Sequence, residues 1–168
     1  MDITIRNEQA GDIDRIARLT QAAFRDAPHS SHTEQFIVNA LRRHQQLTVS
    51  KVALAGEALV GHVAISPVVL SNGATGWYGL GPISVVPERQ GQGIGSKLMK
   101  AALVELEGLG AAGCVLLGDP RYYARFGFEA VSGLELPGVP AEYFQALSFA
   151  GEPPIAVVSY HPAFDAIA

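Results

Sequence analysis

The sequence predicts a single domain of mixed α/β class, in which a central, mostly antiparallel sheet is flanked by helices. The chain has 168 residues, enough for one compact core, and no repeat or linker divides it, so we treat residues 1–168 as one domain. Apolar residues follow a helical period over residues 13–41 and a strand-like pattern over residues 49–86. An apolar strand then runs through a glycine-rich turn into another amphipathic helix at residues 82–109.

The first third of the chain is predicted to contain one strand and two helices. Residues 3–6 alternate apolar and polar side chains, as a half-buried strand does. Asp12 is a suitable cap for a helix whose apolar face extends to Phe24. After a short loop, Thr33 is expected to cap a second helix that ends near His44.

Three strands joined by tight turns follow, and we predict that they form an antiparallel meander. Residues 49–55 and 59–70 are rich in Val, Ile and Ala, and the turn Gly56-Glu57 separates them. Pro67 is expected to bend or bulge the second strand, because proline has no N–H to donate to a neighbouring strand. The third strand is predicted at residues 77–86.

The last part of the chain contains shorter elements. Asp119 and Pro120 suit the cap and the first position of a short helix. The predicted order is a helix at 96–109, a buried strand at 114–117, the short helix from 120, a strand at 128–131, a glycine- and proline-rich loop at 134–140 and a closing strand at 155–160.

Composition excludes several classes of function. The net charge of −4 argues against general nucleic-acid binding, and no apolar run reaches the roughly 20 residues needed to cross a bilayer. The first residues do not resemble a signal peptide, so we expect a cytoplasmic protein. Cys114 is the single cysteine and is interpreted as a buried, inert thiol. No His, Asp or Glu cluster has metal-ligand spacing, so no metal is predicted.

The glycine-rich turn is the feature most indicative of chemistry. Gly91, Gly93 and Gly95 lie between an apolar strand and a helix. The first turn of a helix has unpaired N–H groups and the positive end of the dipole, which together suit a phosphate. A P-loop is excluded because Lys97 follows Ser96 rather than glycine, and a dinucleotide fingerprint is excluded by the Gly-x-Gly-x-Gly spacing. From these residues alone, a tight turn without a ligand remains an alternative.

Two motifs resemble a known family. Gln90-x-x-Gly93-x-Gly95, preceded by Ile83-Ser84-Val85 and Pro87, resembles the acetyl-CoA motif of the GNAT N-acetyltransferase superfamily. Tyr123-Ala124-Arg125-Phe126-Gly127-Phe128 is similar to the Tyr-x-x-x-Gly-Phe element of that family. The order of elements over residues 1–131 also matches, and the stretch from Gly118 to Phe128 resembles the YhbS-like branch.

The resemblance implies acetyl-CoA as the donor and a position for each of its parts. Its pyrophosphate would lie on the turn, and its pantetheine arm would pair with the preceding strand through Val85. The amide of Ile83 would contact the thioester carbonyl and stabilise an oxyanion. That strand, the fourth, would therefore splay from the fifth. The amides assigned to the pyrophosphate are those of Gly91, Gln92, Gly93, Ile94, Gly95 and Ser96.

The resemblance also implies a general acid and a departure from the family in how the pantetheine arm is bound. Tyr123 matches the phenol that protonates the leaving thiolate, while its neighbour Tyr122 is expected to point to the core or the substrate. Leu116 stands where many members carry Asn. We therefore expect either that the backbone around Leu117 and Gly118 holds more of the arm or that the cofactor binds more weakly.

The general base and the acceptor remain open. No carboxylate occurs at residues 77–81, where some members carry Glu, so the candidates are a relayed water or His62. Glu88 is expected to be solvated, Arg42 and Arg43 to face a helix end or CoA, and His29 and His32 to lie near the acceptor. The function predicted first is N-acetylation of a primary amine, on a small molecule or a protein. The alternatives are an acyl-CoA-binding or sensing module and transfer to a hydroxyl. A homodimer through residues 155–160 is also an expectation.

Overall fold

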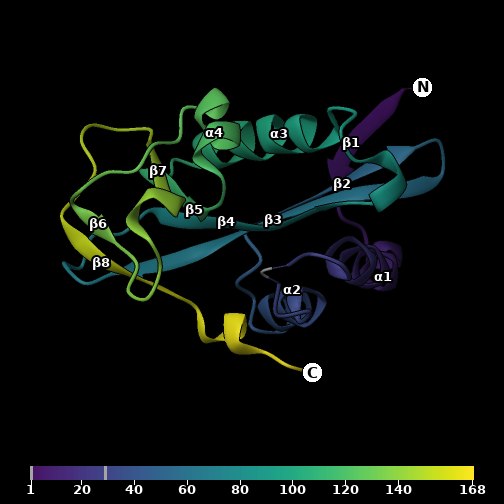
Figure 1. The fold of residues 1–168 in the computed structure, drawn as a ribbon, viewed down its shortest axis with the longest axis horizontal. Coiled ribbons are helices and arrows are strands. Elements are labelled where there is room, and N and C mark those ends of the chain that lie inside the picture. Colours follow the sequence, from purple (N-terminus) through teal and green to yellow (C-terminus); the bar gives the residue numbers. More distant parts are fainter. Residues whose placement is uncertain (1, 29) are drawn as a thin grey trace.

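The described residues, 2–28 and 30–168 of a computed structural model, form an eight-stranded mixed sheet between two layers of helices (Figure 1). The sheet order is β1-β2-β3-β4-β5-β7, and β8 joins it through β3 and also pairs with β6. The strands are β1 (Ile3–Asn7), β2 (Val49–Ala55), β3 (Ala58–Leu70), β4 (Trp77–Val85), β5 (Gly113–Leu117), β6 (Leu134–Glu135), β7 (Phe144–Ser148) and β8 (Ala156–Tyr160). The predicted mixed, mostly antiparallel α/β fold is confirmed.

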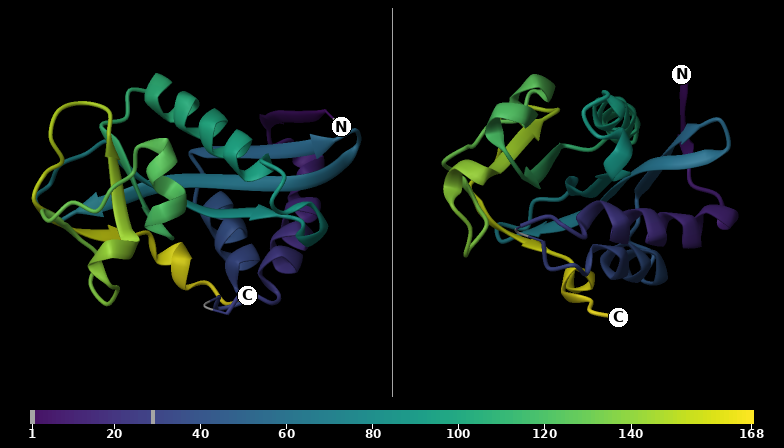
Figure 2. Two further views of the ribbon diagram at one scale, coloured as in Figure 1. Left: turned by 45° about the horizontal axis from the view of Figure 1, so that its top comes forward. Right: turned by 45° about the vertical axis from the view of Figure 1, so that its right-hand side comes forward.

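The helices cover opposite faces of the sheet. They are α1 (Ile13–Phe24), α2 (Glu34–Arg43), α3 (Ile94–Gly108) and α4 (Pro120–Tyr123), joined by five 3₁₀ turns: η1 (Ala10–Asp12), η2 (Pro87–Arg89), η3 (Ala124–Phe126), η4 (Ala141–Tyr143) and η5 (Pro162–Asp165). In Figure 1, α3 and α4 lie above the sheet and α1 and α2 below it. The α3 side of the sheet buries Leu98, Met99 and Leu106, and the C-terminal turn η5 packs on α2 through Ala163 (Figure 2).

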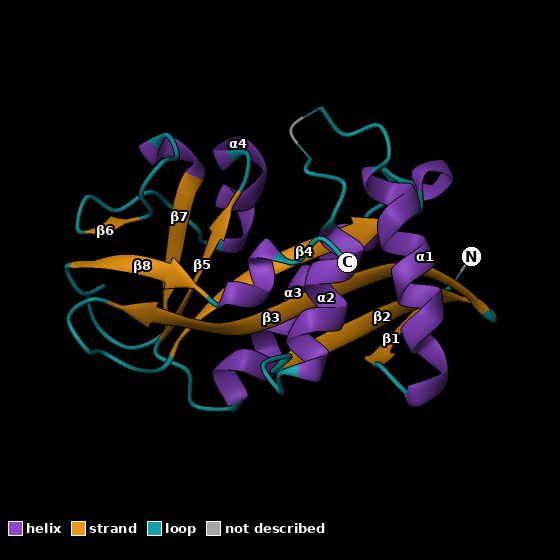
Figure 3. Cartoon of the chain, turned by 90° about the horizontal axis from the view of Figure 1, so that it is seen from below, coloured by secondary structure: helices purple, strands orange, loops and turns teal. Residues whose placement is uncertain are grey.

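The sheet opens between β4 and β5, as predicted. These two parallel strands pair only from Trp77 to Gly79 on β4 and from Gly113 to Val115 on β5. Beyond that point β5 and β7 turn away from β3 and β4, as Figure 3 shows from below. Among the described residues, Leu80 to Val85 therefore have no strand partner on the β5 side. We call this stretch the open edge of β4.

A β-bulge lies within β4, and its position differs from our prediction. Ile83 pairs with Val63, whereas Leu80 pairs with Ile65, so Gly81 and Pro82 together oppose a single residue of β3. The expected irregularity at Pro67 is absent, because Pro67 pairs in register with Tyr78. Pro67 is instead the last β3 residue paired to β4, and from Val68 onward β3 pairs with β8. The missing donor of proline suits this change of partner.

The predictions for the last third of the chain need two corrections. The strand expected at 128–131 is wrong, since only an isolated bridge between Glu129 and Ala146 occurs there. The strand beside β5 is β7, whose sequence Phe-Gln-Ala-Leu-Ser contains a buried glutamine and was not assigned. The loop expected at 134–140 begins with β6, and α3 starts at Ile94 rather than Ser96. The other predicted elements agree with the structure to within about two residues.

Candidate active site

A cavity of about 290 Å³ lies at the amino-terminal end of α3, and we call it the turn cavity. Gly91 and Gly93 have φ angles of 78° and 85°, in the left-handed region that favours glycine. Lys97 N–H donates to the Gly93 carbonyl at 3.2 Å, which is the first bond of the helix. The N–H groups of residues 94–96 therefore have no partner within the helix, and they form a site suited to an anion.

The turn cavity brings most of the predicted turn residues together. Gln92 is exposed and does not line it. Two arginines that the sequence analysis did not assign to the site also line it, and their positive charge adds to that of the helix terminus. The lining residues are Val85, Arg89, Gln90, Gly91, Gly93, Ile94, Gly95, Ser96, Tyr122 and Arg125.

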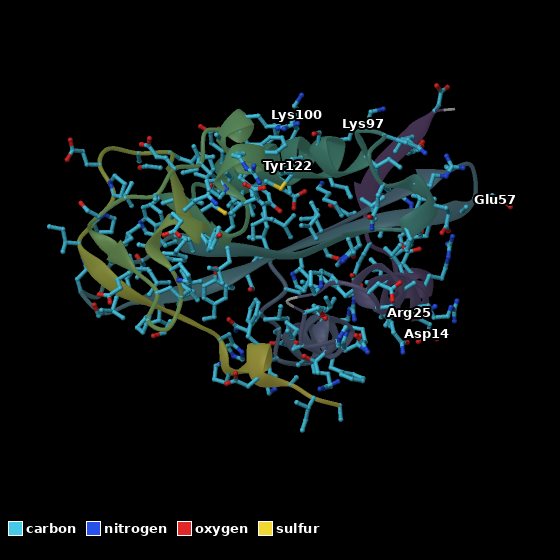
Figure 4. All side chains as sticks on the ribbon, viewed as in Figure 1. Asp14, Arg25, Glu57, Lys97, Lys100 and Tyr122 are labelled. Carbon is cyan, nitrogen blue, oxygen red and sulfur yellow. The ribbon has the colours of Figure 1, made fainter. Side chains whose placement is uncertain are left out.

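The α4 motif contributes a cation as well as aromatic rings. The guanidinium of Arg125 lies 4.4 Å from the centre of the Tyr122 ring, and its Nε donates to the Tyr122 carbonyl at 2.9 Å. Figure 4 shows Tyr122 between α4 and α3, and its hydroxyl lies 3.5 Å from Ser96 Oγ. A guanidinium fixed in this way suits a phosphate oxygen. The sequence contained these residue types, but no periodicity placed Arg125 beside the turn.

The open edge of β4 presents backbone groups in alternation. Val86 N–H donates to the Val60 carbonyl at 2.9 Å, so the backbone of Val86 faces β3. Neighbouring residues of a strand face opposite sides, so Ser84 also faces β3, while Ile83 and Val85 face the open edge. Gln90 Nε2 donates to the Val85 carbonyl at 3.0 Å and ties the turn to the strand. The Ile83 amide and carbonyl and the Val85 amide are thus oriented to meet an extended ligand.

The backbone groups of Gly118 face away from this edge. Its N–H donates to the Tyr143 carbonyl and its carbonyl accepts from Gln145 Nε2, each at 3.0 Å. By alternation, Leu117 presents its backbone to the β4 side. Leu116 is 1% exposed and belongs to the core. Of the pair expected to hold the cofactor arm, only Leu117 faces the open edge.

Gly118 instead makes room for Tyr123. A Cβ at Gly118 would collide with the Tyr123 ring, which also contacts Phe126 and Phe128. Burial raises the pKa of the Tyr123 phenol, and Tyr122 raises it further. The phenol is therefore protonated near neutral pH and is available as a donor. The ring of Tyr123 contacts that of Tyr122 edge-on, and Tyr123 does not line the turn cavity.

A second cavity, of about 360 Å³, lies at the other end of the open edge, and we call it the bulge cavity. It is formed by α1, α2, the bulge of β4, the end of β5 and the C-terminal part of the chain. Its lining is mostly apolar and contains Phe24, Glu34, Ile37, Leu80, Gly81, Pro82, Leu117, Leu136, Pro137, Tyr160 and Phe164. The open edge of β4 thus runs from one cavity at Val85 to another at Leu80–Pro82.

Among the described residues, none of the histidines and arginines considered from sequence lines either cavity. His62 is fully buried, and its Nε2 lies 2.8 Å from Ser50 Oγ. Arg42 donates to Glu8 at 2.8 Å. His32 is exposed, with Nδ1 3.0 Å from the Phe24 carbonyl, and His29 lies outside the described residues. Glu88 is exposed in η2, as expected.

Neither a membrane-crossing helix nor a metal cluster occurs in the described part of the chain. Each helix there is too short or too polar to span a bilayer. Across residues 2–28 and 30–168, no three His, Cys, Asp or Glu side chains are grouped so as to hold a metal ion. Cys114 is buried and free, and burial raises the pKa of its thiol above the usual range.

Comparison with known proteins identifies relatives over most of the chain. Residues 4–131 match the model of the acetyltransferase (GNAT) domain family. A crystal structure of a GNAT family acetyltransferase from Brucella melitensis in complex with acetyl-CoA superposes with a TM-score of 0.88, at 47% identity over 98% of this chain and 99% of that one. The GNAT family N-acetyltransferase YhbS of Escherichia coli, in complex with CoA, gives a TM-score of 0.88 at 32% identity over 99% of this chain and 93% of that one. In sequence, the uncharacterized N-acetyltransferase YhbS of Escherichia coli K12 is 37% identical over 107 residues, which are 63% of this chain and 64% of the relative.

Proposed function

The chain belongs to the GNAT acetyltransferase family, and from this membership we propose that it transfers the acetyl group of acetyl-CoA to a primary amine. The observation that carries the proposal is the open edge of β4, which runs from a cavity suited to an anion to an apolar one. Such an arrangement accommodates two substrates that meet on one strand. We further propose that residues 1–168 act as a single acetyltransferase domain.

The donor is proposed to occupy the turn cavity and the open edge. The pyrophosphate accepts from the amides of Gly91 to Ser96, with Arg89 and Arg125 as counter-charges. The pantetheine arm extends along β4 and pairs with the Val85 amide. The thioester carbonyl then lies at the Ile83 amide, next to the bulge cavity. Complexes of two relatives with acetyl-CoA and CoA support this assignment.

The proposed reaction is direct attack of the amine on the thioester. The ammonium first gives one proton to a solvent water, because only the neutral amine has a lone pair with which to attack. The amine nitrogen then forms a bond to the carbonyl carbon, and the oxygen gains a negative charge that the Ile83 N–H stabilises. As the intermediate collapses, the carbon–sulfur bond breaks and the nitrogen passes its extra proton to a solvent water. Tyr123 donates a hydrogen bond and then a proton to the leaving thiolate, and regains a proton from solvent. The raised pKa of Tyr123 keeps the phenol protonated for this step.

Calorimetry and thiol release test the proposal separately. Acetyl-CoA and CoA are expected to give heat and thermal protection, and free thiol is expected to appear when a panel of primary amines is added. Absence of binding would refute the donor site. Binding without thiol release from any amine would favour the acyl-CoA-binding module over an enzyme.

A further inference from the structure

We infer that the bulge cavity selects a small primary amine that has an apolar body and no carboxylate, and that Glu34 holds its ammonium group. The inference rests on the proposed function, because the acetyl donor must arrive from the other end of the open edge. Two polar residues among otherwise apolar lining residues carry it, Glu34 and Tyr160.

Glu34 provides a negative charge that the described part of the chain leaves without a cation. It is the first residue of α2 and is half-buried. Both of its oxygens accept from the Ser30 hydroxyl, at 2.8 and 2.7 Å, and one hydroxyl proton leaves most of the acceptor capacity unused. None of the ion pairs among the described residues includes Glu34. An ammonium group supplies both the charge and the donors that this carboxylate lacks.

Tyr160 provides a second polar group whose unsatisfied hydrogen bond favours a ligand. Its hydroxyl is buried and has no hydrogen-bond partner among the described residues. The ring is fixed against Phe164 at a centroid distance of 4.8 Å, and a Cβ at Gly79 would lie only 3.1 Å from it. A buried hydroxyl without a partner is unfavourable, so a ligand that hydrogen-bonds it gains affinity. Tyr160 and Glu34 are both lining residues of the bulge cavity.

The remaining lining determines the body of the ligand. The other side chains are aliphatic, aromatic or proline, and among the described lining residues none is Lys, Arg or His. An amino acid would bring a carboxylate without a counter-charge into a cavity that contains Glu34, and repulsion would exclude it. The volume of about 360 Å³ lies at the small end of ligand pockets, which favours a compact amine.

The position of the cavity suits delivery of the nitrogen to the thioester. Gly81 and Pro82 of the bulge form part of the lining, and Ile83 is the next residue along β4. An amine held by Glu34 in this cavity therefore lies beside the strand that would hold the thioester carbonyl.

Phenethylamine and phenylalanine form a matched pair of probes, since they differ only in the carboxylate. With CoA present, we expect calorimetry to show that phenethylamine binds at least about tenfold more tightly than phenylalanine. We expect kcat/KM for thiol release to follow the same order. Glu34→Gln is expected to lower phenethylamine affinity about tenfold and to reduce the discrimination against phenylalanine. Tyr160→Phe is expected to lower the affinity for phenethylamine by a smaller factor. Glu57→Gln, on the distant β2–β3 turn (Figure 4), is the matched control and is expected to change neither.

The outcomes separate this inference from the proposed function. Equal or tighter binding of phenylalanine, no binding of phenethylamine, or unchanged phenethylamine affinity in Glu34→Gln would overturn the inference. Acetyl-CoA affinity is expected to be the same in all variants. Loss of thiol release with every amine, while phenethylamine still binds and Glu34→Gln still weakens it, would refute the acetyl transfer and leave the recognition intact.

Discussion

Acidification from pH 7 to pH 5 is expected to destabilise the fold through one buried imidazole. His62 is fully buried on β3, with Nε2 2.8 Å from Ser50 Oγ. The Ser50 hydroxyl donates its proton to Glu8 at 2.6 Å, so the imidazole must donate from Nε2. Nδ1 is buried and has no partner among the described residues, so a proton added there would have no acceptor. Burial lowers the pKa of His62 from 6.5 to about 4, although the charge of Glu8 opposes the shift.

The direction of the effect follows from proton binding. Between pH 6.5 and about 4 the unfolded chain binds a proton at His62 and the folded chain does not. Stability therefore rises with pH through this window, is fully present above it, and is lost as the pH falls. The two pKa values correspond to about 3 kcal/mol in total, of which about 2 kcal/mol is lost between pH 7 and pH 5.

Urea denaturation at pH 7, 6 and 5 measures this loss, with His62→Gln as the test variant and His44→Gln, at an exposed position, as its control. The wild type and His44→Gln are expected to lose about 2 kcal/mol of unfolding free energy over this range, and His62→Gln much less. Glu8 and Asp12 do not obscure the result. Their pKa values are lowered from 4.5 and 3.8, so their contributions are lost at lower pH. Parallel pH profiles for all three proteins would show that His62 does not titrate as a buried neutral group.

The remaining predictions concern the site. Gly93→Leu places a side chain beside the turn cavity at a residue with φ 85°, and is expected to lower acetyl-CoA affinity about 100-fold or more by calorimetry. The control is Gly110→Leu, which has the same φ near the other end of α3 and is expected to lower only the stability of the fold. Equal acetyl-CoA affinity in both variants would contradict the donor placement. Tyr123→Phe is expected to lower kcat about 10- to 100-fold with unchanged acetyl-CoA affinity, and unchanged turnover would eliminate the proposed acid. Gly118→Ala places a methyl group against the Tyr123 ring, and is expected to lower the free energy of unfolding by about 1–3 kcal/mol and to lower kcat. The control is Gly108→Ala, whose methyl group meets open space. A stable, fully active Gly118→Ala would show that the position of the Tyr123 ring does not depend on a glycine here.

Local signals predicted the part of the site that is continuous in sequence. The turn from Gln90 to Ser96 could be recognised because three glycines separate a strand from a periodic helix, and its cavity contains five of the six predicted turn residues. The strand β2 agrees with its prediction at both ends. The splay between β4 and β5 followed from a family resemblance, because no pattern within one strand determines where pairing with another strand ends.

The bulge cavity could not be predicted, because its polar groups are distant in sequence. Glu34 is the first residue of α2 and Tyr160 is the last residue of β8. Nothing in the sequence near either residue indicates that the two line one cavity. The missed strand β7 has a related cause. Gln145 interrupts its apolar pattern, yet the side chain is buried because Nε2 donates to the Gly118 carbonyl across the sheet. A polar residue with a long-range partner defeats a rule based on alternation.

One inserted residue in β4 determines which backbone groups face the open edge. Leu80 pairs with Ile65, whose carbonyl accepts from Thr48 N–H on the side away from β4, so the backbone of Leu80 faces the β5 side of the strand. Ile83 lies three residues further on, and in a regular strand an odd separation would turn its amide toward β3. The bulge at Gly81 and Pro82 adds one residue, so Ile83 faces the same side as Leu80. Without this bulge the amide of Ile83 would be used in pairing with β3, and the open edge of β4 would have no donor at this position.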